Sequence, residues 1–341
     1  MTSTRIRLLD CTLRDGSYQV EFGFTAEETH AIVLALDSAG VDMIEIGHGL
    51  GLGAHQGGGP KAAECDADYM RAARMAARRA KVGVFAMTAF ARCDDLTAAR
   101  EAGMDFVRFG VDAVQLEAAE PFVRHACALG LETTLFLMKS YTLPAPALRA
   151  FAPRIAEWGA GGAAIVDSAG GMTPDEVREH VRALAEPTQL EIAFHGHNNF
   201  QLAVGNAFAA VEAGARVIDA SLKGMGRSSG NAQIEVLAAA LIRAGYAVEA
   251  DPLALAQAAD TFITPEAFGA GISKTDLVQA MGLVHSGMQP RIDAAAREFG
   301  LDPVQLTLRA GAERGGLDLD KQAVRDLAAR MRREDKAASA G

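Results

Sequence analysis

The segment GVDMIEIG, Gly40–Gly47, decides the fold, because it is one copy of a phrase that recurs along the chain. In each copy an Ala-rich helical stretch ends in Gly, and a short apolar strand follows. The later copies are MDFVRFG after Gly103, LETTLFLM after Gly130, AGGAAIVD after Gly159 and ARVIDASL after Gly214. Gly at a helix C-terminus adopts the left-handed conformation cheaply and turns the chain back. The phrase therefore predicts helices that alternate with parallel strands.

Three further apolar segments bring the number of predicted strands to eight. They are IRLLD at 6–10, KVGVFAM at 81–87 and LEIAFHG at 190–196. The spacing of about 27 to 35 residues is the size of one βα repeat. Eight repeats predict an α/β fold of the (β/α)₈ TIM-barrel type, with residues 1–265 as the catalytic domain. A doubly wound open sheet is the alternative, but no Gly-x-Gly-x-x-Gly follows the first strand.

The pattern changes past about residue 250, where apolar residues recur at helical spacing and no strand is predicted. Asp302 and Pro303 are typical of a helix start, with Pro in the first position. We expect residues 266–335 to form a helical extension packed on the barrel. Residues 336–341 are expected to be a disordered tail.

Composition excludes several classes of protein. The chain has 341 residues, 50% hydrophobic, and a net charge of −10, which argues against nucleic acid or an anionic membrane as a partner. The four cysteines lack Cys-x-x-Cys spacing and are expected to be free thiols in a reducing compartment. The sequence has neither a signal peptide nor an apolar stretch of membrane-span length. We therefore expect a cytoplasmic protein.

The first candidate site follows the strand at 6–10 and reads DCTLRDGSY, Asp10–Tyr18. Arg14 and Asp15 stand side by side where that strand ends. Holding a divalent metal next to an anionic substrate is a natural use for this pair at a barrel mouth. A surface ion pair in a turn is the alternative for the motif taken alone.

The second candidate site is EIAFHGHNNF, Glu191–Phe200. Residues i and i+2 of an extended segment point the same way, so His195 and His197 can converge on one point. Strand-end histidines bonded to backbone are the alternative. With Asp15, the two imidazoles make a three-ligand set with open positions, which suits a catalytic divalent ion.

Polar residues collect where the predicted strands end, and active sites of TIM barrels lie at that face. Lys139 is among them and raises the possibility of Schiff-base chemistry, although nothing in the sequence marks it as desolvated. The full set is Asp10, Arg14, Asp15, Glu45, His48, Arg108, Lys139, Asp167, Ser168, His195, His197, Asp219 and Lys223.

With these motifs placed, the chain resembles the metal-dependent pyruvate aldolases of the 4-hydroxy-2-oxovalerate aldolase type. These belong to the HMG-CoA lyase-like (DRE-TIM) metallolyase superfamily. The resemblance runs from about Asp10 to Gly311 through LRDG, IEIGHGLGLG, FLMKSY, VDSAGGM, HGHNN, DASLKGMGRSSGNAQIEV and GLVHSGM. It implies a lyase that cleaves a 4-hydroxy-2-oxo acid to pyruvate and an aldehyde, or forms the acid from these two compounds.

The resemblance also implies roles for individual residues. Asp15, His195 and His197 are similar to the ligands of a divalent metal, with Mn²⁺ expected and Mg²⁺ or Co²⁺ possible. Arg14 resembles the arginine that stabilises the pyruvate enolate. The expected substrate-binding residues are Ser168, similar to the serine that holds the substrate carboxylate, and His48.

The chain departs from the family pattern at the residue that acts as general base. The family has His two residues after the Gly of RDG and Tyr in the C-terminal helix, whereas this chain has Tyr18 and His285 in those places. An unperturbed His titrates near 6.5 and Tyr near 10, so His285 is the better general base. We predict that the base has moved to His285 and that Tyr18 orients the substrate hydroxyl or relays its proton. Leu50 also replaces an Asp of the family loop.

The C-terminal segment bears on partners. The family's Gly-Gly-Gln-Glu-Asp motif is not recognisable after Gly315–Gly316, which weakens the inference of an aldehyde dehydrogenase partner. We expect a homo-oligomer instead. Apolar Met87, Phe90 and Met138 suggest an uncharged aldehyde half, although ordinary barrel packing explains them equally well.

Two other functions remain open. One is a Claisen-type synthase that joins an acyl-CoA to a 2-oxo acid, although such synthases usually have Glu-Gln where this chain has Ser17–Tyr18. The other is a non-catalytic barrel subunit, against which the intact Arg14, Asp15, His195 and His197 argue.

Overall fold

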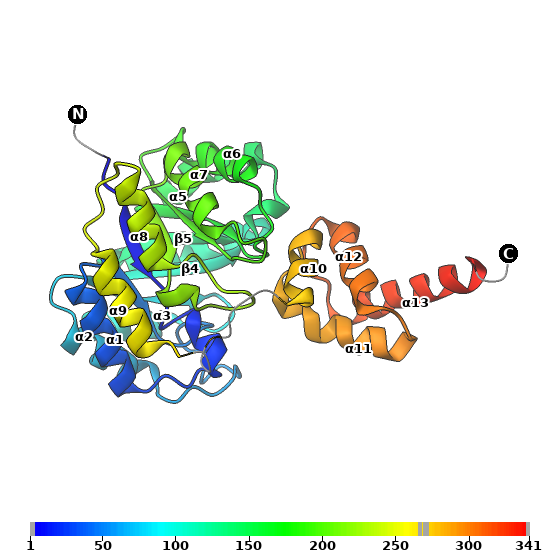
Figure 1. Cartoon of the computed structure of the whole chain (residues 1–341), viewed down its shortest axis with the longest axis horizontal. Helices are drawn as coiled ribbons and strands as arrows, with labels where there is room; N and C mark the ends of the chain where they lie inside the picture. The colour runs from blue at the N-terminus through cyan, green and yellow to red at the C-terminus, as the bar shows by residue number, and fades with distance from the viewer. Residues whose placement is uncertain (1–3, 265–267, 269–272, 339–341) are drawn as a thin grey trace.

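The computed structural model describes residues 4–264, 268 and 273–338. Eight parallel strands follow one another in chain order around a closed barrel, and β1 pairs with both β2 and β8 (Figure 1). The strands are β1 Arg7–Asp10, β2 Met43–Ile46, β3 Lys81–Met87, β4 Phe106–Asp112, β5 Glu132–Met138, β6 Gly162–Asp167, β7 Glu191–Gly196 and β8 Val217–Ala220. The predicted TIM barrel is confirmed, and the open doubly wound sheet is excluded.

Nine of the described helices belong to the barrel. They are α1 Ala26–Ser38, α2 Asp66–Ala76, α3 Cys93–Glu101, α4 Glu120–Ala128, α5 Ala145–Glu157, α6 Pro174–Ala185, α7 Ala203–Ala213, α8 Ile234–Arg243 and α9 Pro252–Phe262. The glycines that end a helix before a strand have φ between +77° and +120°. They are Gly40, Gly103, Gly130, Gly159 and Gly214. Left-handed backbone is open to Gly at little cost, which explains why each helix ends there.

The barrel has two apolar layers. The larger layer lies between the strands and the surrounding helices and includes Ile44, Phe109, Leu135 and Ile218. The second fills the inside of the barrel with Leu9, Met43, Phe85, Phe106 and other side chains. These apolar side chains give the barrel a packed core, and ligand sites in this fold lie above such a core, at the carboxyl ends of the strands.

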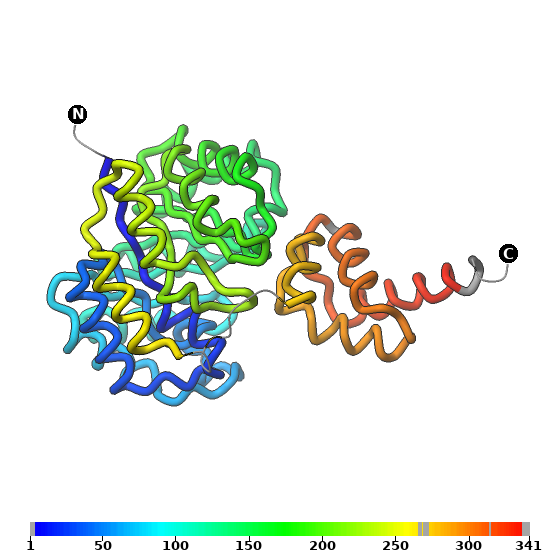
Figure 2. The backbone as a smooth tube through the Cα atoms, in the orientation of Figure 1, coloured from blue at the N-terminus to red at the C-terminus, as the bar shows by residue number. Residues whose placement is uncertain are grey.

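Four helices form the C-terminal extension, which projects from the barrel in Figures 1 and 2. They are α10 Lys274–Gly282, α11 Gln289–Phe299, α12 Pro303–Arg314 and α13 Lys321–Ala338. Helices α11, α12 and α13 share a small apolar core. The extension contacts the barrel through Lys139–Asp318, at 3.0 Å, and Ser228–Asp276, at 2.7 Å. Both barrel residues lie in loops after strands, so the extension reaches the face where the candidate site lies.

Two predicted boundaries, the start of the tail at residue 336 and the domain boundary at 265–266, lie next to residues outside the description. Helix α13 continues to Ala338, so residues 336–338 of the expected tail belong to this helix, and residues 339–341 lie outside the described part of the chain. The expectation of a disordered tail stays a prediction. The expected domain boundary at 265–266 also falls on residues outside the description.

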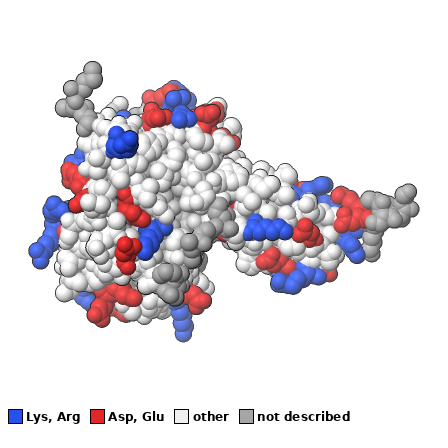
Figure 3. All heavy atoms as spheres, in the orientation of Figure 1, with Lys and Arg blue, Asp and Glu red and all other residues white. Residues whose placement is uncertain are grey.

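The surface in Figure 3 has acidic and basic side chains interspersed over the described part of the face in view. No helix within the described residues has the length and apolar character that crossing a membrane requires.

Candidate metal centre and active site

Asp15, His195 and His197 come together at the carboxyl ends of the strands. All three are buried, and one potential ligand atom of each lies within 4.8 Å of the others. Asp15 follows β1, His195 belongs to β7, and His197 lies just beyond it. Since β8 alone separates β7 from β1 in the closed barrel, the two motifs meet as the sequence predicted.

Both imidazoles are held through the same ring nitrogen. His195 Nδ1 lies 2.9 Å from Asp219 Oδ2, and His197 Nδ1 lies 3.2 Å from the Gly230 carbonyl oxygen. Acceptors at Nδ1 fix the tautomer and place the lone pair of each ring on Nε2. Arg227 Nη2 lies 3.1 Å from His197 Nε2, so a metal ion would replace that contact. Burial, opposed by the charge of Asp15, lowers the pKa of His197 to about 3, so this ring is neutral at working pH.

Asp15 is the anionic member of the set. Burial acts to raise its pKa, but the Arg14 guanidinium and the nearby histidines hold that pKa well below its usual range. Arg14 Nη1 donates to one carboxylate oxygen at 2.8 Å, and Asn231 Nδ2 donates to the other at 2.9 Å. A Cβ at Gly226 would lie 2.8 Å from Asp15 Oδ2, so glycine lets this loop pack directly against the carboxylate.

The donor set fits a divalent metal. Asn231 Oδ1 is buried and has no hydrogen-bond partner among the described residues, although its amide nitrogen bonds Asp15. A carboxylate, two imidazoles and an unpaired amide oxygen are ligands that Mn²⁺, Mg²⁺ and related ions accept. Asp15, His195 and His197 would hold the ion, with Asn231 beside them.

Arg14 is anchored at two nitrogens and open at the third. Its Nε donates to Glu45 Oε2 at 2.6 Å and its Nη1 to Asp15, while Nη2 is buried with no partner within the described part of the chain. The guanidinium carbon lies 4.6 Å from the centre of the Phe85 ring. Because a buried unpaired donor is costly, Nη2 is suited to receive a ligand oxygen.

A buried ionic chain inside the barrel connects Arg14 with His195. Glu45 accepts from Arg14 and from Arg108, and Arg108 Nη1 donates to Asp219 at 2.5 Å. Asp219 in turn bonds His195. Sequence reasoning found Glu45, Arg108 and Asp219 only as strand-end polar residues, and their function as supports required the structure.

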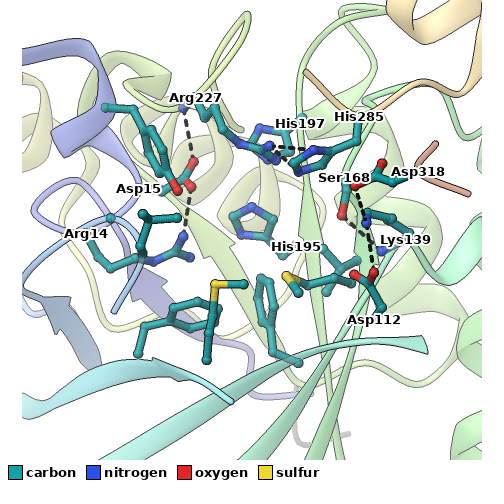
Figure 4. A pocket seen from close by; sticks show the side chains of 18 residues that line it. Arg14, Asp15, Asp112, Lys139, Ser168, His195, His197, Arg227, His285 and Asp318 are labelled. Atoms are coloured by element: carbon teal, nitrogen blue, oxygen red, sulfur yellow. Dashed lines mark hydrogen bonds and ion pairs between the residues drawn. The ribbon is translucent and has the colours of Figure 1, made fainter. Parts of the chain in front are cut away.

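These side chains surround a cavity of about 240 Å³, which Figure 4 shows from close by. This volume is at the small end of ligand pockets and suits a small organic acid. The predicted Ser168, Met87 and Met138 line the cavity, whereas Phe90 is not part of its lining. Its described lining consists of Arg14, Asp15, Tyr18, Gly49, Leu50, Phe85, Met87, Asp112, Phe136, Met138, Lys139, Val166, Ser168, His195, His197, Arg227, His285 and Asp318.

His48 is not brought to this cavity, contrary to its prediction as a substrate-binding residue. Its Nε2 lies 2.9 Å from the Pro60 carbonyl oxygen, its Nδ1 accepts from Leu50 N at 3.0 Å, and its ring stacks on Phe22. Both nitrogens are thus engaged by backbone. The following residues Gly49 and Leu50 line the cavity instead.

Tyr18 and His285 both line the cavity, as the exchange of base positions requires. A Cβ at Gly49 would lie 2.6 Å from the Tyr18 ring, so glycine makes room for Tyr18. Burial raises the pKa of Tyr18. Burial, Arg227 and Lys139 hold the pKa of His285 well below 6.5, and His285 Nδ1 accepts from Gly287 N at 3.1 Å. His285 is therefore neutral at pH 7 and only weakly basic.

Arg227 is one of the cavity residues that sequence reasoning missed. It lies in the loop after β8, and its guanidinium contacts His285 Nε2 and lies 3.1 Å from His197 Nε2 (Figure 4). Its backbone N–H donates to Asp15 Oδ2 at 3.2 Å. The only signal was the motif GMGRSSGN, which the resemblance included without assigning the arginine a function.

The fold and this buried Asp–His–His group are those of a metallolyase built on a TIM barrel. The sequence pattern of the HMGL-like family matches residues 5–262, and the chain belongs to that family of lyases. The expected family resemblance and the expectation of an enzyme are thereby confirmed.

Named relatives cover nearly the whole chain. A 4-hydroxy-2-oxovalerate aldolase of Burkholderia pseudomallei is 34% identical over 332 residues, covering 96% of this chain and 95% of the relative. An oxaloacetate decarboxylase of Mycobacterium tuberculosis is 36% identical over 328 residues, covering 95% and 96% respectively.

A solved structure supports the fold. The carboxyl transferase domain of Rhizobium etli pyruvate carboxylase, with pyruvate and biocytin, aligns with a TM-score of 0.75 at 17% identity. The alignment covers 98% of this chain and 61% of that chain. At this identity the similarity concerns the fold alone.

Proposed function

We propose that this chain is a divalent-metal-dependent aldolase that cleaves or forms the C3–C4 bond of a 4-hydroxy-2-oxo acid, with pyruvate as one product. The observation that carries the proposal is the buried Asp15, His195 and His197 group, which shares one cavity with the unpaired Nη2 of Arg14. The relative named 4-hydroxy-2-oxovalerate aldolase supports the choice of substrate class.

The residues of the cavity suit the charge changes of this reaction. Cleavage moves the C3–C4 electron pair toward C3 and onto the C2 oxygen, while the C4 hydroxyl loses its proton as the aldehyde forms. A divalent ion held by Asp15, His195 and His197 would supply Lewis-acid stabilisation of that negative charge. Arg14 Nη2 would donate to the C2 oxygen, and the Ser168 hydroxyl to the carboxylate of the acid.

The proton of the C4 hydroxyl needs an acceptor. We keep His285 as the proposed base and Tyr18 as the residue that orients the hydroxyl, since both line the cavity. The lowered pKa of His285 makes it a weaker base than an unperturbed histidine. Tyr18, with its pKa raised by burial, is protonated at neutral pH and is suited to donate a hydrogen bond.

A direct assay tests the proposal. Purified protein is incubated with Mn²⁺ and 4-hydroxy-2-oxopentanoate, and pyruvate is measured with lactate dehydrogenase and NADH. We expect pyruvate to form only with metal present. Formation of product with acetyl-CoA and a 2-oxo acid, but none from the hydroxy acid, would favour the Claisen-type synthase instead.

Oxaloacetate decarboxylation is the second candidate, because one relative that covers nearly the whole chain has that name. Loss of CO₂ from oxaloacetate also leaves negative charge on the C2 oxygen of pyruvate, which Arg14 could stabilise in the same way. Decarboxylation needs no base at a C4 hydroxyl, which fits a weakly basic His285. Comparing kcat/KM for oxaloacetate and 4-hydroxy-2-oxopentanoate at equal Mn²⁺ separates the two functions.

The remaining expectations stay proposals. We propose Mn²⁺ as the preferred ion, a cytoplasmic location, and a homo-oligomer without an obligate aldehyde dehydrogenase, nucleic acid or membrane as a partner. They rest on the ligand types and on the sequence features given above.

A further inference from the structure

Three charged side chains form a cluster on the wall of the cavity that faces Arg14 and Asp15 (Figure 4). Lys139 Nζ donates to Asp112 Oδ2 at 2.9 Å and to Asp318 Oδ2 at 3.0 Å. Asp112 ends β4, Lys139 follows β5, and Asp318 lies between α12 and α13. We call Asp112, Lys139 and Asp318 the distal triad. No sequence pattern connects these three residues, which lie up to 206 residues apart.

Lys139 is held in place at this wall. It is 5% exposed, and its backbone N–H donates to the Ser168 hydroxyl oxygen at 3.0 Å. Its φ is +56°, which is uncommon for a residue other than Gly. Its two ion pairs are those of an ammonium group, which argues against the Schiff-base alternative because that chemistry requires a free amine.

The distal triad has one unused hydrogen-bond donor and one buried unused acceptor among the described residues. An ammonium group has three N–H donors, and Lys139 uses two of them on partners within the described residues. Asp318 Oδ1 is buried and has no partner among those same residues. The triad can therefore donate one hydrogen bond and accept another.

The charge of the distal triad narrows the choice of ligand group. One ammonium faces two carboxylates, so a further carboxylate or phosphate would meet net repulsion. A hydroxyl group is neutral, and it can accept from Lys139 and donate to Asp318 at the same time. Phe85, Met87, Phe136 and Met138 line the cavity beside the triad, and they suit the carbon chain that leads to such a hydroxyl.

We propose that the distal triad binds a hydroxyl group on the aldehyde half of the substrate. The inference rests on the proposed function and specifies its substrate class: a 4-hydroxy-2-oxo acid with a further hydroxyl beyond C4. The aldehyde released would then be a hydroxyaldehyde, which agrees with the expected uncharged aldehyde half.

Condensation with pyruvate tests the substrate class. Wild-type protein with Mn²⁺ is given ω-hydroxyaldehydes of two to five carbons, n-alkanals with matching numbers of heavy atoms, and succinic semialdehyde. We expect kcat/KM for the hydroxyaldehyde to exceed that of its matched alkanal by about 10- to 100-fold at the best length, the range for a hydrogen bond to a charged group. Succinic semialdehyde should be the poorest acceptor of its length.

Variants separate recognition from a structural function of the distal triad. Asp318→Ala should lower the ratio of kcat/KM for hydroxyaldehyde to alkanal at least about fivefold, with KM for pyruvate unchanged. Asp112→Asn serves as a second variant if the first fails to fold. Asp94→Asn, at an exposed position on α3, is the matched control and should keep the ratio. Because the same aldehydes are compared in wild type and variants, their intrinsic reactivity cancels from the change in this ratio.

Three results would overturn the assignment. An unchanged ratio in both triad variants would show that the triad only ties the C-terminal extension to the barrel. A rise in KM for pyruvate in both triad variants, with the aldehyde ratio unchanged, would place the pyruvate carboxylate at Lys139 instead. If alkanals condense as well as hydroxyaldehydes at every length, the substrate class is wrong while the aldolase function stands. No condensation or cleavage with any substrate would refute the proposed function itself.

Discussion

Replacing Arg14 by Lys isolates the stabilisation of negative charge at the C2 oxygen. In the structure Arg14 uses Nε on Glu45 and Nη1 on Asp15, and Nη2 is the buried unpaired donor. Lysine has a single nitrogen, which the two carboxylates would engage, so the position of Nη2 would have no donor. The substitution therefore keeps the positive charge at position 14 but removes the hydrogen-bond donor for the C2 oxygen.

The expected magnitude follows from that one lost donor. Removing an oxyanion donor costs about 10²–10³ in kcat, or about 2.7–4 kcal/mol of transition-state stabilisation. The assay is steady-state pyruvate release at saturating Mn²⁺, with metal affinity measured separately by calorimetry. Arg149→Lys, an exposed arginine on α5 that pairs with Glu186, is the matched control and should keep wild-type turnover.

Two results would refute the reasoning about Arg14. Turnover of Arg14→Lys within about threefold of wild type would show that Nη2 does not stabilise the reacting oxygen. A loss of activity that excess Mn²⁺ fully restores would show that Arg14 acts through Asp15 and metal affinity rather than on the substrate.

Four further outcomes are expected. Asp15→Asn should weaken Mn²⁺ binding at least about tenfold by calorimetry without changing the melting temperature, and full turnover in excess EDTA would contradict the metal centre. His285→Ala should lose most cleavage activity and Tyr18→Phe less; a wild-type rate in the first with an inactive second would make Tyr18 the base. Because burial, Arg227 and Lys139 lower the pKa of His285, this base stays neutral as pH falls, so log kcat/KM should remain flat from about pH 8 to about pH 6.5. A decline centred above pH 7 would contradict that assignment. Size-exclusion chromatography with light scattering should show a homo-oligomer, and copurification of a stoichiometric aldehyde dehydrogenase would contradict the expected lack of that partner.

The barrel was predictable because its signal is local and repeated. Gly40 and the equivalent glycines mark helix ends, and each is followed by a strand whose residues are nearly all apolar, as expected for strands covered on both faces. The end of α13 was less predictable. An alanine-containing stretch after charged residues is compatible with a frayed end or with continued helix, and the helix continues to Ala338.

The meeting of Asp15, His195 and His197 was predictable for a different reason. His195 and His197 are two residues apart at a strand end, and barrel closure brings the first strand close to the seventh. His48 shows the limit of this reasoning. It follows the end of β2 as predicted, but its ring is hydrogen-bonded to the backbone of Pro60 and Leu50 and does not line the cavity. Side-chain direction in a loop depends on tertiary partners that no local pattern reveals.

Arg227 and the distal triad could not be predicted because their neighbours come from distant parts of the chain. Arg227 meets His285 only because the C-terminal extension returns to the barrel mouth, and Lys139 meets Asp318 for the same reason. The extension therefore completes the cavity as well as adding helices, since two of its residues line the site.

The ionic chain inside the barrel connects the two halves of the proposed chemistry. Glu45 fixes Arg14, which would face the substrate oxygen, and Asp219 fixes His195, which would hold the metal. Arg108 bonds both carboxylates. Burial acts to raise the pKa of Glu45, but the Arg108 and Arg14 guanidinium groups hold it below its usual value, so the carboxylate stays ionised. A rigid, fully charged support keeps Arg14 and His195 in a fixed relation before any ligand binds. Such preorganisation is what electrostatic stabilisation of a developing oxyanion requires.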